Sequence, residues 1–515
     1  AVDQQHFLLE KSYARTERDI KFSAEKGEMV DRNGYPLALS LPYFQLAINP
    51  MKHQYSVEDV RILASRLGQN FDTLWRKVKQ HTQKGSKYVK LADKLNEDQV
   101  RSLSKLSWEG LMLEEKRGRY YSLGDAASTV IGYVDHEGKG RLGLEYQFDR
   151  YIDGVDGQMS YTQNLLNQVT QIHQYLPPQS GHQLRLTLDQ RLQYRAHEIL
   201  KETVEYHDAE YATAVLLSSK TGEVLAIGNY PSFDPNKPIV SVDHKTKNHA
   251  VADLFEPGSI IKPIALAIMM QSIEERPQII DTHGGDYEYL GRLFHDHRDL
   301  GQVRFEDILL KSSNIAMVKL ASMLPASVLI KGYQSFGLFS PLFVQLPGET
   351  IGRHVTSPGA VDEAAMSYGY GLSVNVLAMA RAYNILANHG KDPGVHMVFE
   401  RHRPSPEQLI NKEITDQISQ MMLKVTEEGI SSHRAKVKGV PVAGKSGTSH
   451  LINESGEYDN HYIATFAGFA PSDDPEYVAV VMVYRPKKNG HYGGQVAAPA
   501  FAKLMAQAFY YPLGD

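Results

Sequence analysis

Apolar residues are distributed differently in two parts of the chain, which meet near residue 185. In the first part, residues 57–80 and 96–113 carry apolar side chains at helical spacing, and each segment predicts amphipathic helix. Residues 26–50 hold two apolar runs separated by Asn33-Gly34. This dipeptide favours the tight turn that joins twisted antiparallel strands, so the segment predicts a β-hairpin.

The second part contains longer apolar segments. Residues 212–231 and 463–486 each read as two strands joined by a polar turn. Residues 259–273 are apolar on nearly every side, which predicts a buried helix, and residues 498–509 predict a last helix. Strands at both ends with helices between them indicate an α+β domain built on an antiparallel sheet.

The boundary between the two parts falls in a segment rich in turn-forming residues. From Tyr175 the chain reads YLPPQSG and then alternates into a strand that ends at Asp189. A chain of 515 residues is too long for one ordinary core, so two or three domains are expected. We predict an amino-terminal domain over residues 1–185 and a second domain over residues 186–515.

Composition excludes several classes of protein. The net charge is −5 and no basic cluster is present, so we expect no nucleic-acid partner. The chain has no cysteine, which excludes disulfides, thiolate metal sites and cysteine nucleophiles. No apolar run is long enough to span a bilayer, and the first residues do not read as a signal peptide.

A serine and a lysine stand together where the buried helix begins, in LFEPGSIIKP. Ser259 and Lys262 are three residues apart, so on a helix they share a face. Serine needs a neighbouring base, and a lysine can be that base when burial or nearby positive charge disfavours its ammonium form. Free backbone N–H groups at a helix start can also stabilise an oxyanion. Alone, this S-x-x-K pattern is common.

Two further motifs follow in order along the chain. LLKSSNIAM supplies Ser312, Ser313 and Asn314, and VAGKSGTSH supplies Lys445 to Thr448 on a segment that reads as an edge strand. Together the three motifs form the S-x-x-K, S-x-N and K-[ST]-G signature of the penicillin-recognising serine enzymes.

Beyond these motifs the chain resembles the class B penicillin-binding proteins along nearly its whole length. KGEMVDRNGYPLALS is similar to a family motif at the amino terminus, with Lys26 where arginine is usual. GRYYSLGDAASTVIGYV is similar to another, with Ser122 and Asp125 in place of proline and glutamate. LPGE, MSYGYGLSVNVLAMARAYNILANHG and HYGGQVAAPAF resemble the division-specific branch, called penicillin-binding protein 3. The elongation-specific branch, penicillin-binding protein 2, is the alternative.

The resemblance implies a fold and a role for each motif residue. The fold would be the penicillin-binding transpeptidase fold, an antiparallel sheet sandwiched by helices, with an elongated amino-terminal pedestal of the dimerisation type. Ser259 would be the nucleophile and Lys262 its general base. The remaining roles would be proton relay for Ser312, amide binding for Asn314, a positive charge for Lys445, carboxylate binding for Ser446 and Thr448, close ligand approach at Gly447, and oxyanion binding by the N–H groups of Ser259 and Thr448.

The implied activity is that of a peptidoglycan D,D-transpeptidase in septal cell-wall synthesis. It would act on stem peptides, be acylated by β-lactams, and need no metal or other cofactor. Its partners would be division-complex proteins and a polymerising glycosyltransferase. The family carries an amino-terminal membrane anchor, absent from this chain, so we expect a fragment of a bacterial inner-membrane protein that faces the periplasm.

Two other functional classes remain as alternatives. A β-lactamase or β-lactam sensor would need a deacylating base, and a shorter chain would suffice for it. A non-catalytic division scaffold would not need all three motifs intact.

Some suggestive segments favour simpler interpretations. His295, Asp296, His297 and Asp299 could suggest a metal site, but without a supporting ligand pattern we expect a polar turn. EQLIN, at 407–411, resembles a β-lactamase deacylation motif, yet its context predicts a surface loop that leads into a helix. Tyr368 and Tyr370 in SYGYG are candidates for a substrate wall because the family places this loop near its site.

Overall fold

The computed structural model describes residues 17–163, 169–239, 241–325, 327–399, 405–452 and 458–512. The chain divides into two compact units, each made of discontinuous segments. The first comprises Ala1–Glu28, Ala38–Tyr120 and Arg150–Gln183, and the second comprises Met29–Leu37, Tyr121–Asp149 and Leu184–Asp515. The predicted division into residues 1–185 and 186–515 treats each domain as one continuous stretch, and it stays a prediction.

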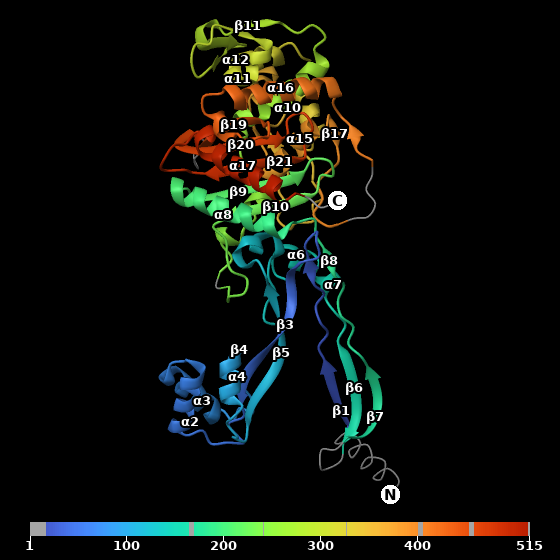
Figure 1. The fold of residues 1–515 in the computed structure, drawn as a ribbon, viewed down its shortest axis with the longest axis vertical. Helices are drawn as coiled ribbons and strands as arrows, with labels where there is room; N and C mark the ends of the chain where they lie inside the picture. The colour runs from blue at the N-terminus through green and yellow to red at the C-terminus, as the bar shows by residue number, and fades with distance from the viewer. Residues whose placement is uncertain are drawn as a thin grey trace. The chain divides into compact units, whose positions relative to one another are not determined.

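A small α+β core forms much of the first unit. Leu46 and Ile48 of β3, Leu63 of α2, Leu74 of α3 and Val89 of β4 are buried together in it. The elements of this core are β3 (Pro36–Ile48), α2 (Val57–Leu67), α3 (Phe71–Gln83), β4 (Val89–Leu95), α4 (Glu97–Leu103) and β5 (Leu111–Tyr121) (Figure 1). Gly68, in the left-handed conformation, ends α2, so the helical pattern of residues 57–80 becomes two helices.

The helical prediction for residues 96–113 is wrong in its second half. The helix α4 stops at Leu103, and β5 begins at Leu111 and pairs with β3. Gly110 between them has a φ of +81° and accepts a hydrogen bond from the Asn49 amide at 2.7 Å. Apolar residues every second position fit a half-buried strand as well as they fit part of a helix, and pairing with β3 decides in favour of the strand.

The first unit also contains a three-stranded antiparallel sheet, ordered β1-β6-β7. Its strands are β1 (Glu17–Phe22), β6 (Gly157–Gln163) and β7 (Val169–Leu176). Every residue of β7 is exposed, so this sheet has no apolar core of its own among the described residues.

A five-stranded antiparallel sheet is the centre of the second unit. Its order is β10-β9-β21-β20-β19, which places β19 at an edge. The strands are β9 (Tyr211–Ser218), β10 (Val224–Tyr230), β19 (Ala443–Ile452), β20 (Tyr458–Ala470) and β21 (Tyr477–Tyr484). β21 reads YVAVVMVY and is buried on both faces, which explains its continuous apolar sequence.

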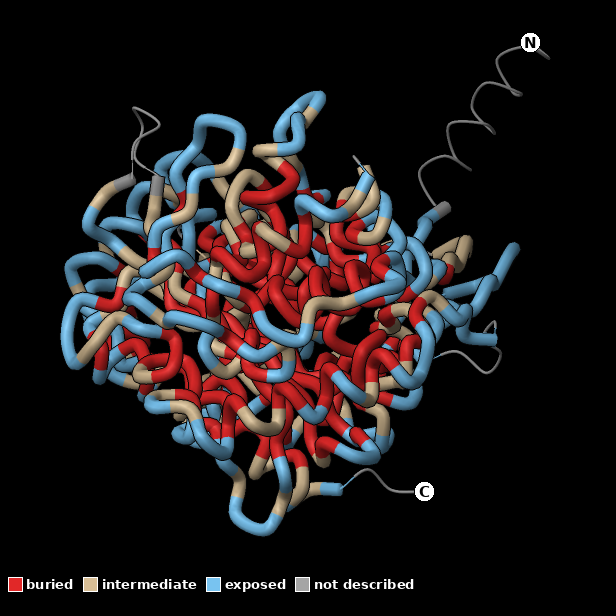
Figure 2. The backbone as a smooth tube through the Cα atoms, turned by 90° about the horizontal axis from the view of Figure 1, so that it is seen from above, coloured by how far each residue is buried: buried red, intermediate tan, exposed pale blue. Residues whose placement is uncertain are grey.

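Helices cover both faces of this sheet. α8 (Gln190–His207) and α17 (Gly493–Tyr510) pack on one face, where Ala479 and Val481 of β21 join Phe466 and Phe501 in a shared core. α10 (Lys262–Ser272), α15 (Val376–Ala387) and α16 (Lys412–Glu428) lie on the other side (Figure 1). Buried positions gather in the interior and exposed ones in the surrounding loops (Figure 2). The prediction of an antiparallel sheet sandwiched by helices is confirmed.

Shorter elements complete the second unit. They are β2 (Met29–Val30), η1 (Gly124–Ala127), α5 (Ser128–Ile131), α6 (Gly143–Gln147), β8 (Leu184–Arg185), η2 (His244–Thr246), α9 (His249–Ala252), η3 (Gly258–Ile261), β11 (Ile279–Asp281), η4 (His283–Gly285), β12 (Asp286–Tyr289), β13 (Arg292–His295), β14 (Gln302–Arg304), η5 (Phe305–Asp307), α11 (Ile308–Lys311), α12 (Asn314–Ala321), α13 (Val328–Ser335), β15 (Arg353–His354), α14 (Ala360–Met366), β16 (Leu372–Ser373), β17 (Lys391–Asp392), β18 (Glu407–Gln408) and η6 (Ser432–Ala435). One further short helix, α7 (Asp149–Ile152), lies where the two units' segments meet in sequence.

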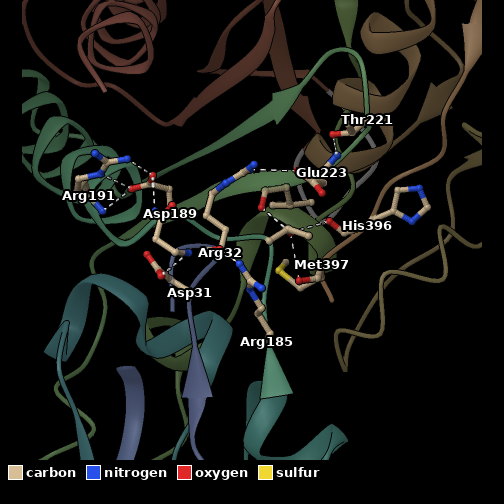
Figure 3. A network of polar contacts seen from close by, with 12 residues as sticks. Asp31, Arg32, Arg185, Asp189, Arg191, Thr221, Glu223, His396 and Met397 are labelled. Atoms are coloured by element: carbon tan, nitrogen blue, oxygen red, sulfur yellow. Dashed lines mark hydrogen bonds and ion pairs between the residues drawn. The ribbon is translucent and has the colours of Figure 1, made fainter. Parts of the chain in front are cut away.

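The predicted hairpin at Asn33-Gly34 is confirmed, and its first strand belongs to the second unit. β2 lies between β3 and β8, and it pairs with β8 in parallel. Beyond β2, Arg32 donates to Glu223 Oε2 at 3.1 Å, with both side chains largely buried (Figure 3). Residues from the start of the chain therefore complete the second unit.

None of the helices in the described ranges is both long and apolar enough to cross a lipid bilayer.

Candidate active site

The segment that carries Ser259 and Lys262 is fixed by a hydrogen bond from helix α15. Ser259 lies in the single 3₁₀ turn η3, and Lys262 begins α10, so the two side chains are on one face. Tyr383 of α15 donates its hydroxyl to the Ile260 carbonyl at 2.7 Å, and both residues are fully buried. Ser259 itself remains partly exposed, as a nucleophile must be.

The second motif lies at the junction of α11 and α12. Ser312 ends α11 in the left-handed conformation, with a φ of +54°, which is uncommon for serine. Its hydroxyl donates to Ser259 Oγ at 3.2 Å. The first and second motifs are therefore in direct contact.

Lys262 hydrogen-bonds to two residues of the second motif. Its Nζ atom donates to the Ser312 carbonyl at 2.6 Å, to Ser312 Oγ at 3.2 Å and to Asn314 Oδ1 at 2.8 Å. The lysine side chain has no exposed surface. Its link to Ser259 thus runs through the hydroxyl of Ser312.

The third motif lies on the edge strand β19, as the sequence predicts. Lys445 is buried, and its Nζ donates to the Ser446 carbonyl at 3.1 Å. Thr448 Oγ1 accepts a hydrogen bond from the Gly493 amide at 3.0 Å. Among the described strands β19 pairs with β20 alone, so its other edge is available to an extended peptide.

Packing around residue 447 requires a glycine there, and the sequence alone does not reveal this requirement. A Cβ atom there would lie 2.5 Å from Thr465 Oγ1 and 3.0 Å from both the Ile260 side chain and the Pro257 carbonyl. The expectation from the sequence is that Gly447 lets a ligand approach the strand closely. In the structure it is the segment before Lys262 that comes close to the strand.

Burial and charge act together on the two lysines. Burial, and then the charge of Lys445, hold the pKa of Lys262 well below its usual value, while Asp296 acts in the opposite direction. Burial lowers the pKa of Lys445 to about 8. At neutral pH the pair therefore combines a lysine that readily loses its proton with one that is still mostly charged.

Tyr368 and Tyr370 lie beside the nucleophile segment. The Gly258 amide donates to the carbonyl of Gly369, between the two tyrosines, at 3.3 Å. The tyrosine rings are 5.4 Å apart and join a small apolar cluster around Phe294, where burial raises the pKa of Tyr368 to about 12. Both are partly buried, and their role in binding stays a prediction.

The segment His295–Asp299 is more than the polar turn that the sequence predicts. His295 is the last residue of β13, and Asp296 hydrogen-bonds to the start of α12, which carries Asn314. The described ranges contain no group of three or more His, Asp or Glu side chains that could hold a metal ion. Glu407 of EQLIN is exposed on the two-residue strand β18, ahead of α16, consistent with the predicted surface position.

Ser432 contacts the third motif, although nothing in the sequence points to it. It belongs to η6 and is almost fully buried, and its Oγ lies 3.1 Å from Ser446 Oγ. A serine in GISSHRAKV carries no spacing signal that relates it to a strand many residues later.

Comparison with known protein families identifies the class. The penicillin-binding protein transpeptidase domain matches residues 212–506, and the penicillin-binding protein dimerisation domain matches residues 21–186. The chain belongs to the penicillin-binding protein transpeptidase family. The predicted resemblance, the two-domain fold and the enzyme class of a serine D,D-transpeptidase are thereby confirmed.

Individual relatives narrow the class. The chain is 32% identical to the probable peptidoglycan D,D-transpeptidase PenA of Neisseria meningitidis, over 97% of this chain and 87% of that protein. It is 30% identical to the peptidoglycan D,D-transpeptidase FtsI of Escherichia coli, over 97% of this chain and 85% of that protein.

Solved structures of related proteins have the same fold over nearly the whole chain. Penicillin-binding protein 3 of Mycobacterium tuberculosis, complexed with aztreonam, superposes with a TM-score of 0.72 at 25% identity, covering 96% of this chain and 98% of that one. A peptidoglycan synthetase of Bifidobacterium adolescentis gives 0.74 at 23% identity, covering 97% and 98%, and supports the fold alone. The resemblance to the division-specific branch is confirmed.

Proposed function

We propose that this chain cross-links peptidoglycan stem peptides through an acyl-enzyme on Ser259. The observation that carries the proposal is the chain of contacts from Ser259 through Ser312 to the buried Lys262, beside an open edge strand. The peptidoglycan D,D-transpeptidase names of its relatives support the same reaction.

In the first step, Ser259 Oγ bonds to the carbonyl carbon of the penultimate D-alanine of one stem peptide. Lys262 in its neutral form takes the serine proton, and Ser312 lies between them as a relay. The amide bond to the terminal D-alanine then breaks, and its nitrogen leaves with a proton. The product is an ester between Ser259 and the shortened peptide.

In the second step, the amine of another stem peptide attacks the ester carbonyl. The new amide bond forms, the ester bond breaks, and Ser259 recovers a proton. The backbone N–H groups of Ser259 and Thr448 are our candidates for stabilising the negative oxygen that develops in both steps.

The remaining motif residues bind the peptide. Lys445, Ser446 and Thr448 would hold its terminal carboxylate, with Ser432 orienting the Ser446 hydroxyl. Asn314 would hold a substrate amide through its side chain. Tyr368 and Tyr370 would form a wall on the neighbouring loop.

We further propose that the reaction serves septal synthesis and that β-lactams block it by acylating Ser259. The FtsI relative and the penicillin-binding protein 3 complexed with aztreonam support this. Division-complex proteins and a polymerising glycosyltransferase as partners, and a membrane-anchored periplasmic location, belong to the same proposal.

The test is intact-mass analysis after incubation with a penicillin, followed by peptide mapping. One adduct is expected, on Ser259. Ser259→Ala should lose all labelling, and Lys262→Ala should slow labelling by about 10²- to 10⁴-fold because the general base is gone.

Two exposed positions on α13 provide controls. Ser335→Ala and Lys331→Ala should label at the wild-type rate, since both residues are exposed and lie outside the site. An adduct on Ser312, Ser313 or Ser446 would overturn the assignment of the nucleophile.

A further inference from the structure

Asp296 makes three hydrogen bonds to the turn that carries the second motif. Its Oδ1 accepts from the Asn314 amide at 2.5 Å and from the Ile315 amide at 3.1 Å. Its Oδ2 accepts from the Ser313 hydroxyl at 2.7 Å. One half-buried carboxylate is therefore bonded to three consecutive residues at the start of α12.

The helix does not need this carboxylate as its cap. Ser313 already caps α12, because its Oγ accepts from the Ala316 amide at 3.0 Å. The hydrogen bonds to Asp296 instead connect the start of α12 with the residue that follows β13, 17 to 19 positions earlier in the sequence. They fix where the turn lies, which the cap from Ser313 does not.

The neighbouring residue fixes the side chain of Asn314. Asn314 Nδ2 donates to the His295 carbonyl at 2.9 Å, so its Oδ1 must point the other way, where it accepts from Lys262. Residues 295 and 296 thus determine both the backbone and the amide orientation at Asn314, and the same turn presents Ser312 to Ser259.

We propose that Asp296 is a positioning residue for acylation, which holds the turn bearing Ser312 and Asn314 and sets a negative charge against Lys262. This inference rests on the proposed roles of Ser259, Ser312 and Lys262. Asp296 acts through these groups and needs no contact with the substrate.

Three charged or titratable groups bear on the protonation state of Lys262. Lys445 reaches it from β19, while Asp296 and His297 face it from the segment after β13. Desolvation and then the charge of Lys262 lower the pKa of His297, so this imidazole adds little positive charge at pH 7. Asp296 is then the negative charge that favours the ammonium form of Lys262, against burial and Lys445.

The test measures the rate of acylation by a fluorescent penicillin across pH in Asp296→Asn and Asp296→Ala, with melting temperatures as a check of folding. Asp296→Asn keeps an oxygen acceptor for the two amides but loses the charge. We expect its rate at the pH optimum to stay close to wild type, with the acid limb moved to lower pH, because Lys262 then loses its proton more readily. Asp296→Ala loses the bonds too, and should acylate about 10- to 100-fold more slowly.

A general structural defect would scale the whole pH profile without moving it. The inference is overturned if the acid limb of Asp296→Asn stays where the wild type has it, or if a folded Asp296→Ala acylates at the wild-type rate. Asp299→Asn is the matched control, since its carboxylate serves the local turn by accepting from the Gly301 amide at 2.8 Å, and it should behave as wild type.

Ser259→Ala, measured in parallel, tests the proposed site separately. If it lost labelling while both Asp296 variants matched the wild type, the site would stand and the role of Asp296 would fall. If it kept labelling, the site and this inference would both fall.

Discussion

The hydroxyl of Ser312 donates a hydrogen bond to Ser259 Oγ at 3.2 Å. The same hydroxyl accepts from Lys262 Nζ, also at 3.2 Å, so the base reaches the nucleophile through a second serine. This arrangement makes proton transfer depend on the exact place of one turn and on the charge state of two buried lysines. Both dependences can be measured.

The acylation rate should pass through a maximum as pH rises. On the acid side it increases as Lys262 loses its proton, at a pH well below the usual pKa of lysine. On the alkaline side it decreases near pH 8, because Lys445 is charged below its pKa of about 8 and loses the charge needed for the carboxylate above it. Stopped-flow acylation by a fluorescent penicillin measures both limbs.

Replacement of Lys445 separates charge from shape. Lys445→Ala should slow acylation by about 10- to 100-fold, the cost of one hydrogen bond to a charged group, with a smaller effect on the melting temperature. Lys445→Arg keeps its charge to higher pH and should therefore lose the alkaline limb. A Lys445→Ala protein that acylated normally but melted much earlier would identify this lysine as structural.

The acyl-enzyme formed with a penicillin should persist for many minutes after free drug is removed. Deacylation needs a base that activates water, and Lys262 is instead placed to serve an incoming amine. Glu407 is exposed on β18, so Glu407→Ala should leave the decay rate unchanged. A fluorescence chase measures this decay, and turnover within seconds would favour the β-lactamase alternative.

Gly447→Ala should destabilise the protein by about 1–3 kcal/mol and slow acylation, because the new methyl group would press on Thr465 Oγ1 and on the segment that carries Ser259. Thr465→Ala should recover part of the loss in the double variant. Thr465 Oγ1 has no hydrogen-bond partner within the described part of the chain, so its removal breaks no hydrogen bond there. Urea unfolding of the four proteins measures the coupling, and strictly additive losses would contradict the predicted clash.

The largely buried carboxylate of Asp253 should make the second unit sensitive to acid. Burial alone would raise the pKa of Asp253, but hydrogen bonds from His249, Lys247 and Tyr211 outweigh it and lower that pKa to about 2. Since the folded pKa is the lower one, the stabilisation is complete above about pH 4 and is lost as pH falls towards 2, by roughly 2 kcal/mol.

Thermal unfolding across this pH range provides the test. Asp253→Asn should flatten the dependence on pH between about 4 and 2. Asp93→Asn, in an exposed ion pair with Lys90, should keep it. An unchanged slope in Asp253→Asn would contradict the assignment.

The sequence predicts the parts of the site that depend on local spacing. Ser259 and Lys262 share a face because they are three residues apart, and the apolar segments at 212–231 and 463–486 indicate the paired strands of a sheet. The three motifs could be related to each other through the family signature, although their contacts depend on tertiary folding.

The sequence does not predict contacts between segments that share no periodic pattern. Asp296 looks like part of a polar turn because its partners lie 17 to 19 residues later. Ser432 gives no signal because its importance comes from the packing of η6 against β19. The sequence does not predict that α4 ends at Leu103 either, because the pairing of β5 with β3 determines this end.

The ion pair between Arg32 and Glu223 joins residues 191 positions apart, and it has a consequence for biosynthesis. A ribosome releases Arg32 long before Glu223 exists, while most of the first unit can be completed once residue 183 has emerged. The strand β2 can pair with β3 as soon as that hairpin has been made, but its other partner, β8, is synthesised only after the segments of the first unit. The second unit can therefore complete its fold only when a segment that is synthesised early joins segments that are synthesised much later.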